Sequence, residues 1–270
     1  MVDMNPSWVP VLCYHRVCPE KDFGKVRSIC VRPENFRAQM RCLKDLGFTA
    51  LSVQTFVHYL RLQKNIPSRS VVITFDDGYQ DNFTYAVPIL KQFGFTANIF
   101  LVTDRIGKTN AWDEENIPLL TEDQIKEMRD QGMVFGSHTA SHMDMTKAEA
   151  SRMREELERS RKKIEDLTWR RDIPFCYPYS RFNQDTKRRV REAGYLCGLA
   201  MDAGPWDQTQ DLFEMSRVQV FPSTSLFGFW KKIQSWYPRW AEFQKRLKAQ
   251  PGALKGSPSA HGGGFPPAGI

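Results

Sequence analysis

The stretch Val71-Val72-Ile73-Thr74-Phe75-Asp76-Asp77-Gly78-Tyr79 decides the fold of this chain. Its first five residues are apolar apart from Thr74, which is the composition of a strand covered on both faces, as in a parallel sheet. The strand then runs into two adjacent carboxylates and a glycine, a combination that is common in turns. The stretch therefore predicts an α/β protein with polar residues at the end of a buried strand.

The same alternation of short apolar runs and longer helical patterns continues along the chain. The predicted strands cover residues 9–14, 71–75, 96–102, 133–136, 173–177, 195–200 and 217–221. Helices are predicted over residues 33–46, from Ser52, and over 82–93, 121–131 and 147–167. The charges of the last helix are expected to face solvent. About seven parallel strands form either a doubly wound sheet or a barrel, and in both the site lies at their carboxyl ends.

The composition is that of a folded protein of one or two domains. Of 270 residues, 41% are apolar and 26% are charged, which is enough to bury a sizeable core. The net charge of +7 favours anionic partners. The basic residues are dispersed and accompany no paired-cysteine or RNP-like motif, so nucleic acid is not an expected partner. The six cysteines form no CxxC pair, and we expect them to be reduced.

No segment reads as a membrane span or a secretory signal. Apolar runs stay below the roughly 18 residues that a spanning helix needs. Residues 1–10 contain Asp3 and no basic region followed by an apolar run. The expected location is therefore cytoplasmic, unless a leader has been removed.

The C-terminal part has a different pattern. Between residues 224 and 248, aromatic and aliphatic residues recur at helical spacing, with Pro238 inside the stripe and basic residues opposite to it. This amphipathic segment either packs on the main domain or lies on an anionic membrane surface, peripherally at the inner membrane face. The following segment is rich in glycine and proline, which predicts disorder. The predicted parts are a catalytic domain over 1–222, an amphipathic helix over 223–248 and a disordered tail over 249–270.

Two histidines follow another predicted strand. The segment Ser137-His138-Thr139-Ala140-Ser141-His142 holds two of the five histidines, four residues apart. This spacing suits two imidazoles on one metal ion. With one carboxylate of the Asp76-Asp77 pair they would form a set with open positions, suited to zinc and also to iron(II) or another divalent ion. An ordinary acidic turn is the alternative for the Asp76-Asp77 pair taken alone.

Two further clusters follow predicted strands. Phe175-Cys176-Tyr177-Pro178-Tyr179-Ser180 is a strand that ends in a loop stiffened by proline, and a plain turn is the alternative. Tyr14-His15-Arg16 ends the first strand and holds the one other histidine placed to reach the same rim. A lone histidine is more often structural than catalytic, so His15 is a weak candidate by itself.

With these motifs in this order, the chain resembles the polysaccharide deacetylases, carbohydrate esterase family 4, over about residues 9–220. The resemblance implies a distorted parallel (β/α) barrel and metal-dependent hydrolysis of N-acetyl groups on amino sugars. It also implies that Asp76 is the general base, and that a divalent metal is bound by Asp77, His138 and His142. Zinc is the expected ion, and cobalt, nickel or iron would suit the same ligands. By the same resemblance, the backbone N–H of Tyr179 would stabilise the oxyanion.

The chain departs from the common pattern of that family in two ways. Cys176 stands where most members have an arginine that orients the base, and no histidine follows the last predicted strand to act as the acid. The subgroup resembling poly-β-1,6-N-acetylglucosamine deacetylases also lacks this late histidine and uses one from an early Tyr-His motif. This makes His15 the expected acid. Arg217 or Asp202 is expected to position Asp76 in place of the missing arginine.

The expected partner is a glycan that contains N-acetylated amino sugars. Tyr79, Tyr177 and Trp206 are the expected substrate contacts, and Trp112 and Tyr179 could also stack on a sugar ring. Core packing is the alternative role for each of these aromatic residues. Two other functions stay open: a deacetylase or deformylase of a lipid-linked amino sugar, and a non-catalytic glycan-binding protein on the same scaffold.

Overall fold

The computed structural model describes residues 8–113, 115–201 and 211–249. Its internal contacts divide the chain into two compact units, with the boundary between Ser235 and Trp236. The first unit holds the strands and the helices up to α7 (Leu226–Lys232), and the second holds α8 (Tyr237–Ala249). Among the described residues, no helix combines the length and the apolar character needed to cross a membrane.

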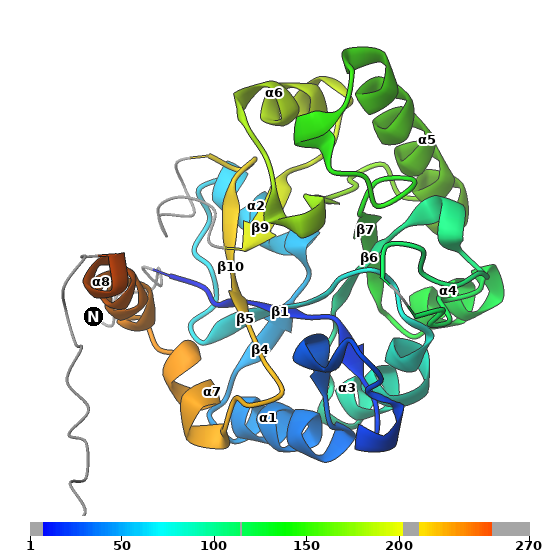
Figure 1. The fold of residues 1–270 in the computed structure, drawn as a ribbon. Coiled ribbons are helices and arrows are strands. Elements are labelled where there is room, and N and C mark those ends of the chain that lie inside the picture. Colours follow the sequence, from blue (N-terminus) through cyan, green and yellow to red (C-terminus); the bar gives the residue numbers. More distant parts are fainter. Residues whose placement is uncertain (1–7, 114, 202–210, 250–270) are drawn as a thin grey trace, which may run out of the picture. The chain divides into compact units, whose positions relative to one another are not determined.

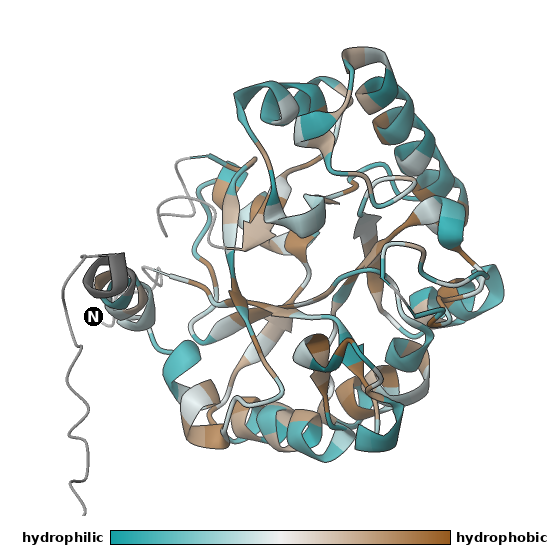
Figure 2. Ribbon diagram, viewed as in Figure 1, coloured by the Kyte–Doolittle hydropathy of each residue, from teal (hydrophilic) through white to brown (hydrophobic). Residues whose placement is uncertain are grey.

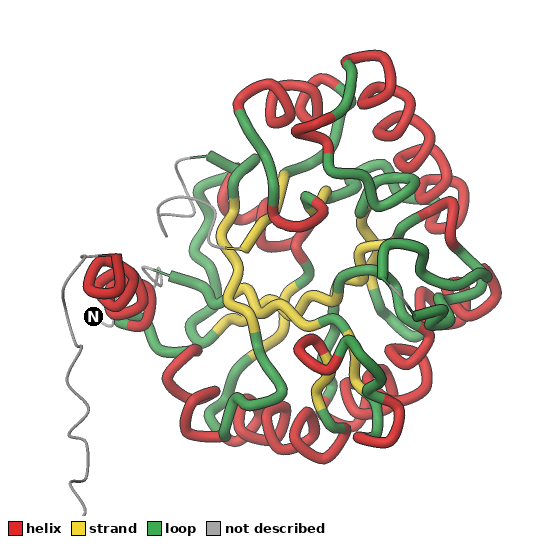
Figure 3. Tube along the Cα trace, in the orientation of Figure 1, coloured by secondary structure: helices red, strands yellow, loops and turns green. Residues whose placement is uncertain are grey.

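Seven of the described strands close into a barrel, which is the yellow ring of Figure 3. In spatial order they are β1 (Val11–Tyr14), β5 (Ser70–Phe75), β6 (Asn98–Leu101), β7 (Val134–Ser137), β8 (Phe175–Cys176), β9 (Gly198–Met201) and β10 (Met215–Gln219). Every neighbouring pair is parallel, and the pairing of β1 with both β5 and β10 completes the ring. The predicted parallel barrel is confirmed, and the open doubly wound sheet is excluded.

The strand β5 gives the barrel its distortion. On one side it pairs with β1. On the other side its first residues pair with β4 (Thr49–Leu51), which lies outside the ring, and its last residues pair with β6. All residues of β5 are buried, as its apolar sequence predicts. A separate parallel pair is formed by β2 (Arg16–Val17) and β3 (Cys30–Val31).

Helices surround the ring of strands in Figure 1. They are α1 (Pro33–Asp45), α3 (Val87–Phe93), α4 (Glu122–Asp130), α5 (Ala150–Thr168), α6 (Gln184–Glu192) and α7, whereas α2 (Val53–Arg61) lies across one end of the ring. Three predicted helix ends are confirmed by capping contacts or backbone conformation, whereas α5 begins three residues after its predicted start and α6 was not predicted. The hydroxyl of Ser52 accepts from the Thr55 N–H at 3.0 Å, and Thr121 forms a capping box with Gln124. Gly94 ends α3 in the left-handed conformation.

The amino-terminal end of the barrel is closed by α2. Its side chains Phe56 and Val57 belong to one buried cluster with Val11, Val72 and Met215, which come from β1, β5 and β10. Inward-facing residues are two apart on a strand, so the next inward positions lie closer to the carboxyl ends. Figure 2 shows hydrophobic colours where β1 and β5 cross the barrel and mostly hydrophilic colours along α5. The polar clusters of the sequence therefore gather at the opposite end of the barrel from α2.

The C-terminal segment forms two helices, α7 and α8, and the aromatic stripe predicted there is divided. Phe229 and Ile233 are buried, whereas Leu226 and Phe227 are 50% and 66% exposed. Packing against the first unit therefore buries some of the apolar side chains of the stripe and leaves others exposed. Of the predicted tail, residues 250–270 lie outside the described part of the chain.

Candidate active site

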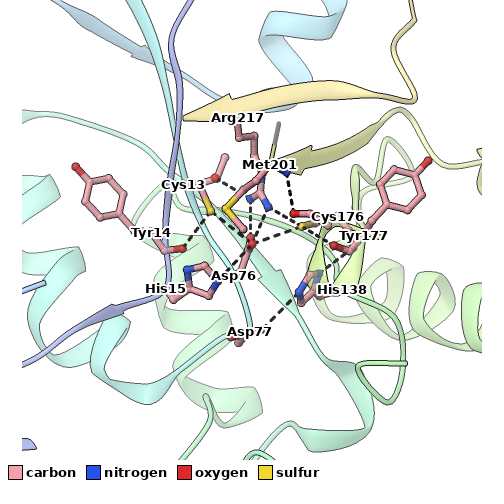
Figure 4. A network of polar contacts seen from close by, with 12 residues as sticks. Cys13, Tyr14, His15, Asp76, Asp77, His138, Cys176, Tyr177, Met201 and Arg217 are labelled. Atoms are coloured by element: carbon pink, nitrogen blue, oxygen red, sulfur yellow. Dashed lines mark hydrogen bonds and ion pairs between the residues drawn. The ribbon is translucent and has the colours of Figure 1, made fainter. Parts of the chain in front are cut away.

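Loops that follow four barrel strands meet at the carboxyl end of the barrel. They line a cavity of about 180 Å³. Because parallel strands end at one edge, residues distant in sequence come together there. Figure 4 shows the side chains that converge at this point. The cavity lining includes His15 after β1, Asp76 and Asp77 after β5, His138 and His142 after β7, and Tyr179 after β8.

The candidate metal site consists of Asp77, His138 and His142. Each offers one donor atom, and the three atoms lie within 4.8 Å of one another. Nε2 of His138 and Nε2 of His142 are 3.4 and 3.3 Å from Oδ1 of Asp77. This oxygen and Nδ1 of His142 are buried and have no hydrogen-bond partner among the described residues. A carboxylate with an unsatisfied buried oxygen, faced by the Nε2 atoms of two imidazoles, fits a divalent cation.

His138 is held in the tautomer that a metal ligand requires. Its Nδ1 donates a hydrogen bond to the backbone oxygen of Cys176 at 2.8 Å. This bond leaves the lone pair on Nε2, the nitrogen that faces Asp77. Burial lowers the pKa of His138 to about 4. The imidazole is therefore neutral near pH 7 and can act as a donor to a cation.

Asp76 forms a buried ion pair with Arg217, which projects from β10 into the barrel (Figure 4). Nη1 of Arg217 donates to Oδ1 of Asp76 and Nη2 donates to Oδ2, both at 2.7 Å. Burial raises the pKa of the Asp76 carboxyl, but the guanidinium of Arg217 outweighs burial and holds this pKa well below its usual range. Asp76 is therefore an anion near pH 7. Of the two residues expected to position Asp76, Arg217 makes the contact, and Asp202 lies outside the described residues.

Two thiols lie against the same carboxylate. Sγ of Cys13 and Sγ of Cys176 are each 3.6 Å from Oδ2 of Asp76. Nη2 of Arg217 is 3.0 Å from Sγ of Cys176. Because the side chain of Cys176 is short, the guanidinium of Arg217, which comes from β10, has room beside Asp76. All six cysteines are free thiols, as predicted.

His15 lies beside Asp76, with 3.9 Å between its Nε2 and Oδ2 of the carboxylate. The first helical turn after β5 fixes its backbone, because Nδ2 of Asn82 donates to the His15 carbonyl oxygen at 2.8 Å. The same turn holds the next residue, since Nε of Arg16 donates to Asp81 at 2.7 Å. Sequence reasoning missed Asn82 and Asp81, which fix the segment that carries His15.

Comparisons with known proteins agree with this arrangement. The sequence model of the family described as polysaccharide deacetylase matches residues 63–198. The protein YxkH of Bacillus subtilis (strain 168) is 30% identical over 231 residues, which cover 86% of this chain and 78% of YxkH. The chain belongs to the polysaccharide deacetylase family.

Two further relatives of this polysaccharide deacetylase family member extend the likeness. The poly-β-1,6-N-acetyl-D-glucosamine N-deacetylase of Staphylococcus epidermidis is 27% identical over 231 residues, covering 77% of this chain and 78% of the relative. The structure of the Streptococcus pyogenes deacetylase PplD, in complex with acetate, superposes with a TM-score of 0.74 at 26% identity. That superposition covers 85% of this chain and 100% of PplD.

In this member of the family, two aromatic side chains flank His142 at the cavity. The Trp112 ring stacks on the imidazole of His142 with centroids 4.2 Å apart. The Tyr179 ring meets the same imidazole edge to face at 4.6 Å. Tyr179 is 49% exposed. Both rings therefore border the space that a substrate would enter.

The structure rules out ring stacking for two of the expected substrate contacts. Tyr79 and Tyr177 are fully buried, so neither ring can stack on a sugar, although Tyr177 is one of the residues that line the cavity. Neighbouring residues of a strand point to opposite faces. Because Cys176 points into the barrel, Tyr177 points away from the site, as Figure 4 shows, and its hydroxyl donates to a backbone carbonyl at 2.9 Å. The other expected residues, Trp206 and Asp202, lie outside the described residues.

The loops of the site hold strained backbone. Non-glycine residues with positive φ occur at Asp77 (72°), Thr139 (65°), His142 (64°), Tyr179 (57°) and Ser180 (54°). Such conformations cost about 1–3 kcal/mol each and persist only where the surroundings impose them. The directions of the Asp77 and His142 side chains therefore depend on the packing around the loops as well as on the strands.

One buried charge near the site contradicts the sequence expectation. Glu156 belongs to α5, whose charges are predicted to face solvent, yet its side chain is 0% exposed. The signal for its burial is present in the sequence. Met153, Leu157, Ser160 and Ile164 are also buried, and together with Glu156 they recur at spacings of three and four residues.

We expect the substitution Arg217→Gln to lower the free energy of unfolding by about 3–5 kcal/mol, because it leaves the buried Asp76 carboxylate without its partner. Urea denaturation measures the change. The control is Arg188→Gln, which removes the ion pairs with Asp185 and Glu192 on the surface, where the arginine side chain is 54% exposed, and should cost at most about 1 kcal/mol. If the two variants had equal free energies of unfolding, the buried Arg217–Asp76 pair would not be needed for the stability of the barrel.

Proposed function

We propose that this protein is a metal-dependent hydrolase that removes N-acetyl groups from amino sugars in a polysaccharide or oligosaccharide. The observation that carries the proposal is the cluster of Asp77, His138 and His142 beside an anionic Asp76 in one cavity. Membership of the polysaccharide deacetylase family supports the same reaction class.

The cation would be held by Asp77, His138 and His142. When bound, a divalent cation polarises an amide carbonyl and lowers the pKa of a water molecule next to it. Zinc is the ion that we propose, because one carboxylate and two imidazoles are a donor set that catalytic zinc sites use. Cobalt, nickel and iron(II) accept the same donors.

Asp76 would act as the general base. Its ion pair with Arg217 keeps the carboxylate ionised and fixes its orientation. As a water oxygen attacks the acyl carbon, the carboxylate accepts one proton from that water. Arg217 acts through Asp76, and the arrangement replaces the arginine that the family pattern has at the position of Cys176.

His15 would act as the general acid. Its protonated imidazole donates a proton to the sugar nitrogen as the C–N bond breaks, and the products are a free amine and acetate. The backbone N–H of Tyr179 would stabilise the negative charge that develops on the acyl oxygen. Asp76 and His15 lie side by side, with 3.9 Å between their nearest side-chain atoms, so one group can act on the attacking water and the other on the leaving nitrogen of the same amide.

The substrate class that we propose is a polymer of N-acetylglucosamine. The S. epidermidis relative is named as a deacetylase of poly-β-1,6-N-acetyl-D-glucosamine. Trp112 and Tyr179 border the cavity and offer ring faces to a sugar. A lipid-linked amino sugar or a formyl group are the competing substrates. A non-catalytic role loses one of its two arguments, because Arg217 supplies the charged contact to Asp76 that a cysteine cannot provide, and the absence of a late histidine is the other.

We also propose that the protein works at an anionic membrane surface. Phe221, Leu226 and Phe227, here called the α7 surface, are 41%, 50% and 66% exposed. Basic groups lie among these rings: Nζ of Lys231 is 5.1 Å from the ring centroid of Phe227, and Nζ of Lys232 is 5.9 Å from that of Phe221. Exposed aromatic rings interleaved with lysines are typical of an interfacial membrane contact.

The α7 surface begins near the catalytic end of the barrel. Phe221 follows β10 by two residues, and parallel strands place their carboxyl ends, with the site, at one edge. A membrane-bound protein would therefore have its site near a glycan at that surface. The cytoplasmic location stays a prediction.

For the reaction, we expect purified protein that is loaded with zinc to release acetate from N-acetylglucosamine oligomers. Asp77→Asn and His142→Ala should lose bound zinc and activity together, because each removes a ligand. Elemental analysis measures the metal, and an enzymatic acetate assay measures the product. A matched panel of formylated and lipid-linked sugars, with products identified by mass, tests the competing substrates. Full zinc occupancy in both variants would refute the ligand assignment.

For the acid, we expect His15→Ala to keep zinc and to lose activity by a factor of about 10² to 10⁴, the usual contribution of a general acid. The control is His58→Ala, because His58 is an exposed histidine on α2, at the far end of the barrel. Unchanged turnover in His15→Ala would move the acid role to another residue.

For the membrane contact, we expect the protein to float with vesicles that contain anionic phosphatidylglycerol and not with neutral phosphatidylcholine vesicles. The double substitution Leu226→Ser with Phe227→Ser should weaken binding by about tenfold or more, because it removes two apolar side chains from the contact. Leu62→Ser is the control, since Leu62 is also 50% exposed but follows α2. Protein that stays at the bottom with both vesicle types would refute the contact.

A further inference from the structure

Glu156 is a buried carboxylate of α5 that binds the loop between the two candidate histidine ligands. Its Oε2 accepts hydrogen bonds from the backbone N–H of Ala140 at 3.0 Å and of Ser141 at 2.8 Å. Its Oε1 accepts from the hydroxyl of Ser141 at 2.9 Å. Both oxygens of one side chain therefore hold the loop from the helix that packs behind it.

The charge of Glu156 is compensated on the side away from the cavity. Nη2 of Arg152 donates to Oε1 at 2.8 Å, and Nη2 of Arg159 lies 3.8 Å from the same oxygen. Both arginines also contact Glu155, which is 51% exposed. The buried carboxylate thus has a guanidinium on one side and backbone amides on the other, so its position is fixed from both sides.

The loop that Glu156 holds is strained. Thr139 and His142 both have φ near +65°, a region in which a β-branched residue such as threonine is rarely found. A conformation of this kind persists only where the surroundings impose it. The amides that Glu156 binds lie between these two residues. Releasing them would allow the loop to relax and would turn His142 away from Asp77.

We propose that Glu156 is a positioning residue that sets the affinity of the Asp77–His138–His142 site for a divalent cation. The proposal rests on the proposed metal-dependent function, because it concerns the same ligands. Outer contacts that orient metal ligands typically change affinity by about 10- to 100-fold when they are removed. Glu156 acts on the backbone of the ligand loop and does not touch the cation site itself.

The test measures zinc binding to the full chain by competition with a chromogenic chelator. Glu156→Ala removes both acceptors and should raise the zinc dissociation constant by about 100-fold, and Glu156→Gln, which keeps one carbonyl oxygen, by about 10-fold. Glu155→Gln should bind zinc as the unchanged protein does, because Glu155 contacts the same arginines but not the loop. In the metal-free protein, the amides of Ala140 and Ser141 should exchange hydrogen faster in both Glu156 variants.

A further variant separates positioning from general stability. Ile164→Ala opens a cavity in the buried face of the same helix without touching the loop, so it should lower the melting temperature and leave zinc affinity unchanged. The proposal is overturned if Glu156→Gln and Glu156→Ala bind zinc within about threefold of the unchanged protein, or if Ile164→Ala weakens binding as much as they do. If the unchanged protein binds no zinc, the metal-dependent function fails as well.

Discussion

The arrangement of the site depends on two adjacent buried carboxylates, each of which needs a partner for its charge. Asp76 and Asp77 are 2% and 4% exposed, and a buried carboxylate without a partner is strongly unfavourable. The two carboxylates have different partners in the barrel. Asp76 receives the guanidinium of Arg217, whereas Asp77 faces the imidazoles of His138 and His142. One carboxylate is thus satisfied by the protein, and the other is left with an unpaired oxygen that suits a cation.

The Arg217–Asp76 pair shows that a required contact can come from a different strand. The family pattern places an arginine at the position of Cys176 on β8, and here the guanidinium comes from β10. The thiol of Cys176 remains next to both partners. What the site needs is a cation beside Asp76 at the correct distance, and the closed ring of strands offers several inward positions from which to supply it.

Strained loops at the site require support from behind. The left-handed residues of the ligand loops aim side chains that a relaxed turn would direct elsewhere. Buried polar side chains outside the cavity supply this support. Asn82 holds the carbonyl of His15, and Glu156 holds the amides of Ala140 and Ser141. A site of this kind depends on two layers of residues, and only the inner layer touches the cavity.

The sequence by itself determined the seven strands of the ring, several helix ends and the polar residues at the strand ends, but not the short strands β2, β3 and β4 or the helix α6. These features depend on neighbours within a few residues, such as the Thr121 cap or the apolar run before Asp76. Closure of the ring through β1 and β5 was decided only by the tertiary structure. So was the pairing of Asp76 with Arg217, which lies 141 residues away. The burial of Tyr79, Tyr177 and Glu156 was decided in the same way, because local periodicity shows that residues share a face but not what covers it.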